Sequence, residues 1–376
     1  MAANGENQRE RMRERPRKGG KPMSKSFVNK VLLGGAVAAG AAVWAIAPRT
    51  FSDKRRNYVP AVPDVWYAHR GLHDAGSGLT AQYANESGEY VALARRMAMK
   101  AGYGSPDTPG VIAPENSLAA FAAACEAGYG IELDLQMTRD GEVVVVHDGD
   151  LMRVAGDPRR IADLTYDELT RIPLFPTDAP GACKAAPLPL ALEEPPLVTT
   201  PDNAPEGYYQ HVPLFADVLK VVAGRVPLIV EYKFDDNSKW DPHDVELMEK
   251  GDALLQAYSG KYVIESFNPA AVNWYKENRP EVCRGQLSWW PYGEDKPTDP
   301  VALGKEYAAG ALVFDWISRP DFVAYDWKGG NSPQVKLARF MGAVPVSWTV
   351  RSRDEFAQCC DQFDRHIFEA FVPDEQ

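Results

Sequence analysis

Short runs rich in β-branched and aromatic residues alternate with helix-like stretches along the chain from residue 65 onward. The runs that we expect to be strands are residues 65–71, 130–136, 142–148, 226–233, 262–268, 283–290, 311–318, 344–350 and 366–372. The expected helices between them include residues 116–128, 165–172, 245–259, 269–279 and 332–342. Asn116 is a suitable N-cap for the first of these helices. This alternation predicts βα units joined into a parallel sheet.

Polar or catalytic-type side chains recur where the expected strands end. They are His69, Asp134, His147, Glu231, Ser266, Trp289, Asp315 and Trp348. In a (β/α)8 barrel all these strand ends meet on one face, where active sites are built. In an open doubly wound sheet they would meet at a crevice instead. No GxGxxG turn follows the first strand, so the sequence does not support the dinucleotide-binding version, and we predict a (β/α)8 TIM barrel over residues 60–376.

Two segments do not fit a compact barrel. Residues 75–110 separate the first strand from its helix, and residues 174–212 are rich in proline and glycine. Long connections in compact domains are usually lids or mobile segments with a function. We therefore expect both insertions to lie above or beside the active site.

The composition is that of a globular protein that does not bind nucleic acid. Apolar residues make up 45% of the 376 residues and charged residues 25%, and the formal net charge of -11 opposes attraction to nucleic acid. The cysteines at positions 125, 183, 283, 359 and 360 have neither CxxC nor zinc-site spacing, so we interpret them as ordinary thiols.

The N-terminal region predicts a membrane anchor. Residues 1–30 are polar and basic, as in a disordered tail. Residues 31–48 form an apolar run without any charged residue. As a helix this run spans about 27 Å, which suits one membrane pass. A secretory signal peptide cleaved after Ala47 and a buried core helix are the alternatives, but Pro48 would make a poor first mature residue.

The orientation of this anchor follows from its flanking charges. More Lys and Arg residues precede the apolar run than follow it, which predicts an N-terminus inside and a catalytic domain outside the cell membrane. Basic residues nevertheless lie on both sides of the run, among them Arg49, Lys54, Arg55 and Arg56.

The densest chemistry lies in an ordered set of short motifs. They read AHRG at 68–71, PENS at 114–117, IELD at 131–134, TRDG at 138–141 and HD at 147–148. This set resembles the glycerophosphodiester phosphodiesterase family, whose pattern reads HRG, PEN(T/S), E-x-D, T-x-DG and HD. The resemblance continues at EYK 231–233, SF 266–267 and WTV 348–350. It implies a TIM-barrel phosphodiesterase over most of residues 65–373.

Three carboxylates predict a metal site. Glu132 and Asp134 are two positions apart on an expected strand, so both side chains point to the same face. Glu231, at the end of another strand, would complete an all-oxygen site. Such ligands favour Mg²⁺ or Ca²⁺, with Mn²⁺ also possible, over zinc. The alternative, that these are ordinary exposed acids, is disfavoured because same-face acids in an apolar strand are costly.

Cleaving a phosphodiester requires neutralised phosphoryl charge, a base and an acid. Arg70 offers a planar fork for phosphate oxygens, and Lys233 adds a point charge beside Glu231. His69 and His147 are then the acid and base pair, because an imidazole titrates near neutral pH. The sequence does not assign which histidine is which.

Several further residues have both structural and functional interpretations. Glu115 and Asn116 are expected to support the site by orienting Arg70 and capping a helix. His73 could line the site, and Phe267 and Trp348 could either contact glycerol or pack at the barrel mouth. Histidines that lie outside the motifs are expected to be structural, namely His211, His243 and His366.

The sequence departs from the family pattern at two places. The insertion after Gly71 is longer than expected, and the last strand lacks the common Thr-Asp pair. We therefore predict a metal-dependent enzyme that releases an alcohol and sn-glycerol 3-phosphate from glycerophosphodiesters. The alternatives are a lysophospholipase D or phospholipase-like enzyme, which could form a cyclic phosphate, and a catalytically silent phospho-ligand-binding membrane protein.

Overall fold

The computed structural model describes residues 39–48, 61–108, 110–176, 210–237, 239–291 and 297–374. The chain divides into two units, residues 1–42 and 43–376. Of the first unit only residues 39–42 are described, at the start of a helix of residues 39–46. The expected basic tail and most of the second insertion, residues 177–209, lie outside the described residues.

Parallel strands of the second unit close into a barrel. In chain order they are β1 (Trp66–His69), β2 (Gly130–Met137), β6 (Leu228–Tyr232), β7 (Tyr262–Ser266), β8 (Arg284–Ser288), β9 (Phe322–Asp326), β10 (Val344–Val350) and β11 (Arg365–Phe368). The sheet closes because β1 pairs in parallel with both β11 and β2. This closure confirms the predicted (β/α)8 barrel.

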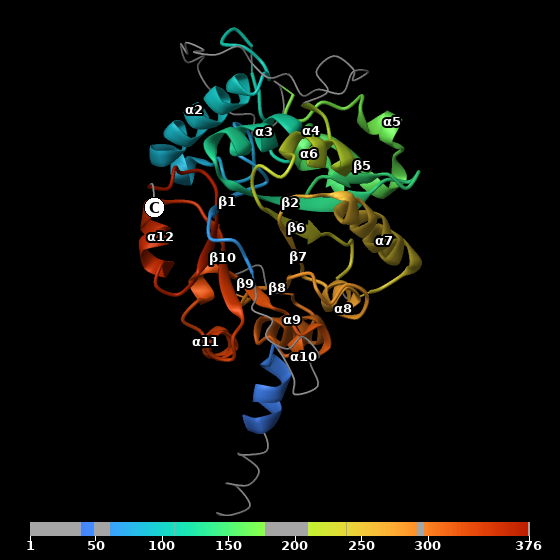
Figure 1. Ribbon diagram of the computed structural model, residues 1–376, viewed down its shortest axis with the longest axis vertical. Coiled ribbons are helices and arrows are strands. Elements are labelled where there is room, and N and C mark those ends of the chain that lie inside the picture. Colours follow the sequence, from blue (N-terminus) through green and yellow to red (C-terminus); the bar gives the residue numbers. More distant parts are fainter. Residues whose placement is uncertain are drawn as a thin grey trace, which may run out of the picture. The chain divides into compact units, whose positions relative to one another are not determined.

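Helices surround the strands on the outside of the barrel (Figure 1). The longer ones are α2 (Ala84–Lys100), α3 (Leu118–Ala127), α6 (Phe215–Val222), α7 (Pro242–Ala257), α8 (Pro269–Asn278), α9 (Pro300–Gly310), α11 (Pro333–Phe340) and α12 (Arg353–Cys359). The shorter ones are α4 (Met152–Ala155), α5 (Tyr166–Leu169) and α10 (Asp315–Ser318), with 3-10 turns η1 (Ala81–Tyr83), η2 (Ile161–Asp163) and η4 (Trp327–Gly329). Two further strands, β4 (Asp150–Leu151) and β5 (Asp157–Arg160), pair with each other between β3 and β6 in the sequence.

The barrel interior has an apolar layer and a charged layer. Alternating residues share a face of a strand, so Tyr67 and His69 of β1 point the same way, as do Ile229 and Glu231 of β6. Tyr67 and Ile229 belong to a buried apolar cluster to which β1 and the strands from β6 to β11 contribute. His69 and Glu231 each lie two residues nearer the carboxyl end, so the polar layer lies at the catalytic end of a TIM barrel.

Three sequence predictions of local structure were wrong. Residues 311–318 form a turn and α10 rather than a strand, and the barrel strand is β9. A short apolar run does not distinguish a strand from a buried helical turn. The expected strand 142–148 is the shorter β3 (Val143–Val145), which pairs antiparallel with β2 outside the parallel barrel. Ser117, not Asn116, caps α3, because its side chain accepts a hydrogen bond from the backbone N–H of Ala120 at 3.2 Å.

The first insertion is structured rather than a simple loop. It carries η1 and α2, a helix whose buried residues Tyr90, Val91, Ala94, Ala98 and Met99 recur at helical spacing. Helix α2 packs against α3. Arg95 of α2 also lies 2.7 Å from Asp74, which accepts backbone N–H bonds from Ile112 and Ala113. These contacts fix both ends of the insertion beside β1.

The first residues of the second unit lie against Arg319, which follows α10. The Arg319 guanidinium donates to the carbonyls of Trp44 and Ala47 at 2.6 and 2.7 Å. Among the described residues, no helix has both the length and the apolar character needed to cross a membrane. Residues 31–38 of the expected anchor lie outside the described part, so the anchor stays a prediction.

Candidate active site

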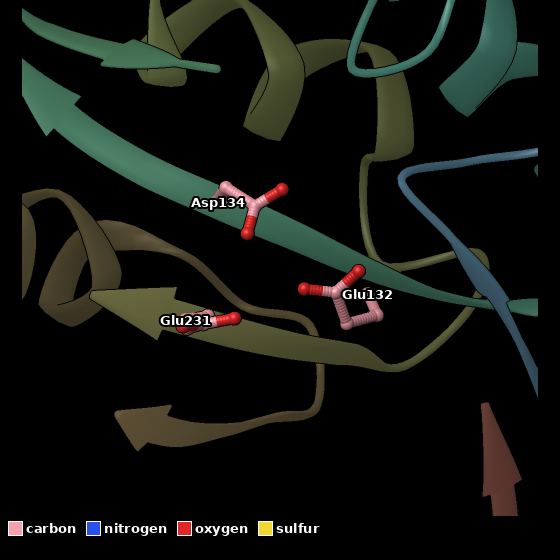
Figure 2. Close-up of side chains that lie close together, drawn as sticks. All are labelled: Glu132, Asp134 and Glu231. Atoms are coloured by element: carbon pink, nitrogen blue, oxygen red, sulfur yellow. The ribbon is translucent and has the colours of Figure 1, made fainter. Parts of the chain in front are cut away.

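Three buried carboxylates converge at the charged end of the barrel. Glu132 and Asp134 project from β2, and Glu231 projects from the neighbouring β6 (Figure 2). The parallel register places Asp134 directly beside Glu231. One oxygen of each carboxylate lies within 4.8 Å of one oxygen of the others. The spacing of two on β2 thus has the predicted result that both side chains share the interior face.

The electrostatics of this cluster fit a divalent cation. Burial, together with the negative charges of Asp134 and Glu231, raises the pKa of Glu132 well above its usual range. Burial also raises the pKa of Glu231 to about 7, although Lys233 opposes the shift. Burial opposes ionisation of Asp134, but Lys233 and His147 hold its pKa below the ordinary value. A cation among these oxygens would relieve the mutual repulsion, and the ligand set suits Mg²⁺, Ca²⁺ or Mn²⁺.

Arg70 and Lys233 lie beside the carboxylates. Arg70 Nε is 3.4 Å from Asp134 Oδ2, and Lys233 Nζ is 2.7 Å from Glu231 Oε1 and 3.2 Å from Asp134 Oδ1. Arg70 has a left-handed backbone with φ 56, and Gly71 follows with φ 82. A Cβ at Gly71 would lie 2.9 Å from the carbonyl carbon of Ala120. The glycine therefore permits the tight turn that aims Arg70 across the barrel mouth.

His69 lies at the end of β1 between two acids. Its Nδ1 is 3.2 Å from Glu369 Oε2, and its Nε2 is 3.9 Å from Glu132 Oε2. Burial, and next the charge of Arg70, lowers the pKa of His69 to about 4. The ring is therefore neutral at pH 7, and Glu369 fixes its orientation through Nδ1.

His147 follows β3 and reaches the same mouth from another side. Its Nδ1 is 2.6 Å from Asp148 Oδ1, and Asp148 accepts a second bond from Arg153 Nε at 2.6 Å. Burial and the nearby positive charges of Arg70 and Lys233 lower the pKa of His147. His147 also lines a cavity of about 980 Å³, together with Phe267 and Trp348.

Glu115 and Asn116 contact the charged side chains from behind. Glu115 accepts bonds from Arg70 Nη1 at 2.8 Å and from Arg153 Nη2 at 2.6 Å. The side-chain amide of Asn116 donates to Asp134 Oδ2 at 2.8 Å. Through these contacts Glu115 and Asn116 fix the side chains of Arg70 and Asp134, as expected of supporting residues.

The remaining predicted residues divide between the mouth and the interior. The rings of Phe267 and Trp348 meet edge to face with centroids 5.6 Å apart, and Lys233 Nζ lies 5.7 Å from the Phe267 ring. His73 is fully buried, and its Nε2 lies 3.0 Å from Glu369 Oε1. His366 lies 2.7 Å from Ser347 Oγ, against Trp66 and Phe356, in a structural position.

The model of the glycerophosphoryl diester phosphodiesterase family matches residues 105–363. The chain belongs to this family. The match begins after α2, so it does not include His69 and Arg70. The closed sheet nevertheless brings both residues to the carboxylates of β2 and β6.

Individual relatives of the family agree over short alignments. A glycerophosphodiester phosphodiesterase of Caldanaerobacter subterraneus is 43% identical over 60 residues, which cover 16% of this chain and 25% of the relative. Glycerophosphodiester phosphodiesterase 1 of Bos taurus is 41% identical over 61 residues, which cover 16% of this chain and 18% of the relative. These alignments therefore span a quarter or less of the relatives.

One solved structure supports the fold. It is a Silicibacter pomeroyi protein described as a candidate glycerophosphoryl diester phosphodiesterase, with a TM-score of 0.51 and 18% identity. The similarity covers 88% of this chain and 94% of that chain. At this identity the likeness concerns the barrel alone.

The sequence did not point to two buried acids, Glu369 and Glu265, that lie next to the predicted site residues. Glu369 follows β11 and accepts from Arg351 Nε at 2.9 Å as well as contacting His69 and His73. Glu265 of β7 pairs in register with Glu231, and burial raises its pKa well above the usual range. Both could have been found from alternation, because Glu369 is two residues beyond the interior Ile367 and Glu265 is two beyond Val263.

Arg153 is a third residue that sequence reasoning missed. It lies on α4, outside the motifs, and joins Asp148 to Glu115. It thereby connects the partner of His147 to the partner of Arg70. Its position depends on the fold of residues 149–176, and we find no sequence signal that would have identified it.

Proposed function

We propose that this protein is a metal-dependent phosphodiesterase that hydrolyses glycerophosphodiesters to an alcohol and sn-glycerol 3-phosphate. The observation that carries the proposal is a convergence at one end of the barrel. Carboxylates suited to hold a metal ion, cationic side chains suited to bind phosphate and two histidines lie together there. These residues are Glu132, Asp134, Glu231, Arg70, Lys233, His69 and His147. Membership of the family supports the same reaction class.

Substrate binding is assigned to the charged residues. Arg70 and Lys233 would bind the anionic phosphoryl oxygens, with Arg70 offering its planar fork. Glu132, Asp134 and Glu231 would hold Mg²⁺, Ca²⁺ or Mn²⁺, which when bound neutralises charge on the phosphoryl group. Glu115 restrains Arg70 through the 2.8 Å hydrogen bond to its guanidinium.

Proton transfer is assigned to the two histidines. The oxygen of a water molecule attacks phosphorus, and the bond between phosphorus and the alcohol oxygen breaks. His69, whose lowered pKa of about 4 leaves the ring neutral at pH 7, accepts the proton of the water, and His147 in its protonated form donates a proton to the leaving alkoxide, so that the atoms and charges balance. Glu369 and Asp148 engage Nδ1 of His69 and His147 respectively, which leaves Nε2 of each ring for the reaction.

The test is a screen of metal ions against diesters, followed by phosphorus NMR. We expect glycerol 3-phosphate to accumulate with Mg²⁺, Ca²⁺ or Mn²⁺ and to be lost in His69→Ala and His147→Ala. Turnover of no diester with any of these metals would contradict the proposal and leave a phospho-ligand-binding role.

Lysophospholipids are a second candidate substrate class. The cavity of about 980 Å³ beside His147 is larger than a simple glycerol group requires and has several aromatic walls. A lysophospholipase D would release the alcohol from such a lipid. Phosphorus NMR also tests the cyclising variant, because an exclusively linear phosphomonoester excludes it.

We also propose that residues 31–48 anchor the protein in the cell membrane with the catalytic domain outside. The uncharged run and the excess of preceding basic residues support this orientation. Carbonate extraction followed by protease protection tests it. Release of the protein by carbonate, or a protected catalytic domain, would contradict it.

A further inference from the structure

The short helix α10 and the turn before it present an apolar surface on the outside of the barrel. From residue 311 to residue 320, every residue that is not buried is apolar. These residues are Ala311, Val313, Phe314, Trp316 and Ile317. Val313 is 41% exposed and Trp316 is 46% exposed. A segment that faces water normally carries polar side chains at its outward positions, so this surface is suited to an apolar partner.

A second apolar segment contacts the first. Residues 43–48 read VWAIAP and carry only apolar or aromatic side chains. The indole ring of Trp44 stacks on that of Trp316, with centroids 5.8 Å apart and an angle of 23° between the planes. Trp44 nevertheless stays 54% exposed. We call these two rings, together with their chain neighbours Val43 and Val313, the tryptophan patch.

The backbone under the tryptophan patch is firmly held. The Arg319 guanidinium donates to the carbonyls of Trp44 and Ala47 at 2.6 and 2.7 Å, and its central carbon lies 4.8 Å from the centre of the Trp44 ring. Ile46 is 7% exposed and belongs to the main apolar core. The two rings are therefore exposed on a fixed part of the fold and not on a loose end.

The place of the patch in the sequence indicates what covers it. The uncharged run of residues 31–48 ends at residues 43–48, which supply half of the patch. Tryptophan side chains concentrate where a membrane-spanning segment leaves the hydrocarbon and meets the lipid headgroups. Trp316 is far from this run in the sequence, but the fold stacks it on Trp44. A bilayer that surrounds the end of the run would therefore meet Trp316 as well.

The charged groups beside the patch are compatible with a lipid surface. Asp315 is 1% exposed, so α10 presents no acid to its surroundings. Lys276 Nζ donates to the carbonyl of Ile317 at 2.6 Å and lies 3.2 Å from Glu277. Together with Arg319 it places two cationic side chains against α10. Basic side chains at the edge of an apolar surface are favourable beside phosphate headgroups.

We propose that the tryptophan patch lies in the headgroup region of the membrane, so that α10 rests against the lipid. The inference rests on the proposed anchor and goes beyond it, because it assigns lipid contact to a part of the barrel that is distant from the anchor in the sequence. An enzyme held by the anchor alone would be free to turn above the membrane. Contact through Trp316 also fixes the orientation of the barrel.

The test uses the full-length protein in vesicles of equal parts phosphatidylcholine and phosphatidylglycerol. Brominated phosphatidylcholine quenches tryptophan fluorescence on contact, whereas iodide quenches rings that face water. We expect lipid brominated near the glycerol backbone to quench the wild type. The anchor alone would bring Trp44 to this lipid, so Trp316 is the decisive ring. Trp316→Phe should reduce the lipid-quenched emission by about half, because the patch holds two such rings.

Trp240→Phe is the matched control. Trp240 is 36% exposed, contacts the Phe234 ring and lies in a surface hollow on α7, outside the tryptophan patch. Its removal should reduce the iodide-quenched emission and leave the lipid-quenched emission unchanged. Both changes keep an aromatic ring at the position, and circular dichroism with a thermal melt checks that the variants are folded.

Two results would overturn the inference. One is that Trp316→Phe loses emission that iodide quenches and brominated lipid does not. The other is that Trp316 is shielded from iodide but is not quenched by brominated lipid, which would indicate a second copy of the protein on the patch.

Carbonate extraction separates this inference from the anchor. Protein that stays in the membrane while Trp316 is not lipid-quenched would keep the anchor and reject the lipid contact of α10. Protein that carbonate releases, but whose Trp316 is lipid-quenched at neutral pH, would support the lipid contact and reject the anchor. Fluorescence quenching does not depend on turnover, so the proposed phosphodiesterase reaction is tested separately.

Discussion

Replacing Glu369 by glutamine tests how His69 is held. The carboxylate accepts hydrogen bonds from Gly78 N at 2.9 Å, from Ser77 Oγ at 3.3 Å and from Arg351 Nε at 2.9 Å, and contacts the rings of His69 and His73. A carboxylate accepts the Nδ1 proton of His69, which leaves Nε2 free to exchange protons with substrate. A glutamine amide can instead donate to Nδ1 and place the ring proton on Nε2, which is the wrong tautomer for a base.

The magnitude follows from what a positioned base contributes. General acid–base catalysis is worth about 10²- to 10⁴-fold, so we expect Glu369→Gln to lower kcat by roughly that factor with a small change in KM. Glu355→Gln is the matched control, because Glu355 accepts from the backbone N–H of Arg351 at 2.7 Å but does not contact His69.

The assay is steady-state hydrolysis of a glycerophosphodiester, combined with nitrogen NMR of the His69 tautomer. Circular dichroism and a thermal melt check that the variant is folded. A folded Glu369→Gln enzyme with wild-type kcat, or a low kcat with an unchanged tautomer, would refute the reasoning.

Three further predictions follow from the site. Arg153→Ala should lower kcat about 10- to 100-fold and change KM much less, because Asp148 and Glu115 lose a shared partner. Added guanidinium should restore part of the lost kcat. Arg159→Ala, at an exposed ion pair on β5, should change neither kcat nor KM. Divalent metal should raise the thermal midpoint by binding the native state, and Asp134→Asn should abolish that rise, whereas an equal rise in the variant would place the ion elsewhere. Burial opposes ionisation of Glu115, but Arg70 and Arg153 lower its pKa from the ordinary 4.5 to about 2. The ionised carboxylate therefore stabilises the fold above pH 4.5, and this stabilisation is lost as the pH falls toward about 2. Urea unfolding from pH 7 to pH 3 should therefore show a shallower pH dependence for Glu115→Gln than for the wild type, and parallel curves would argue against this account.

Local patterning was sufficient to predict the barrel but not every strand. The run at residues 226–233 was read correctly as β6, since a β-rich run bounded by turn signals matches a buried parallel strand. The run at 311–318 has the same apolar character but is interrupted by the left-handed backbone of Leu312 and is followed by that of Arg319, which the sequence does not reveal. Helix α2 was missed because residues 75–110 were interpreted as a long loop from the length of the segment. The buried residues of α2 nevertheless have helical spacing.

The site was predicted where chemistry and spacing coincide. Glu132 and Asp134 share a face because strands alternate, and the pairing of β2 with β6 brings Glu231 beside them. Long-range partners were harder to predict. The contact between Glu369 and His69 depends on closure of the sheet between β1 and β11, which joins residues 300 positions apart. Arg153 depends in the same way on a small insertion whose position only the folded chain defines.

Hydrolysis by metal-depleted protein tests the central claim most directly. The protein is freed of metal with a chelator, given glycerophosphocholine and supplied with Mg²⁺, Ca²⁺ or Mn²⁺ in separate reactions, alongside Glu231→Gln and His147→Ala. We predict no turnover without metal, restored formation of glycerol 3-phosphate in the wild type, and loss of this restoration in both variants. Full turnover by the metal-free wild type, or by either variant, would contradict the assignment of the carboxylates and histidines.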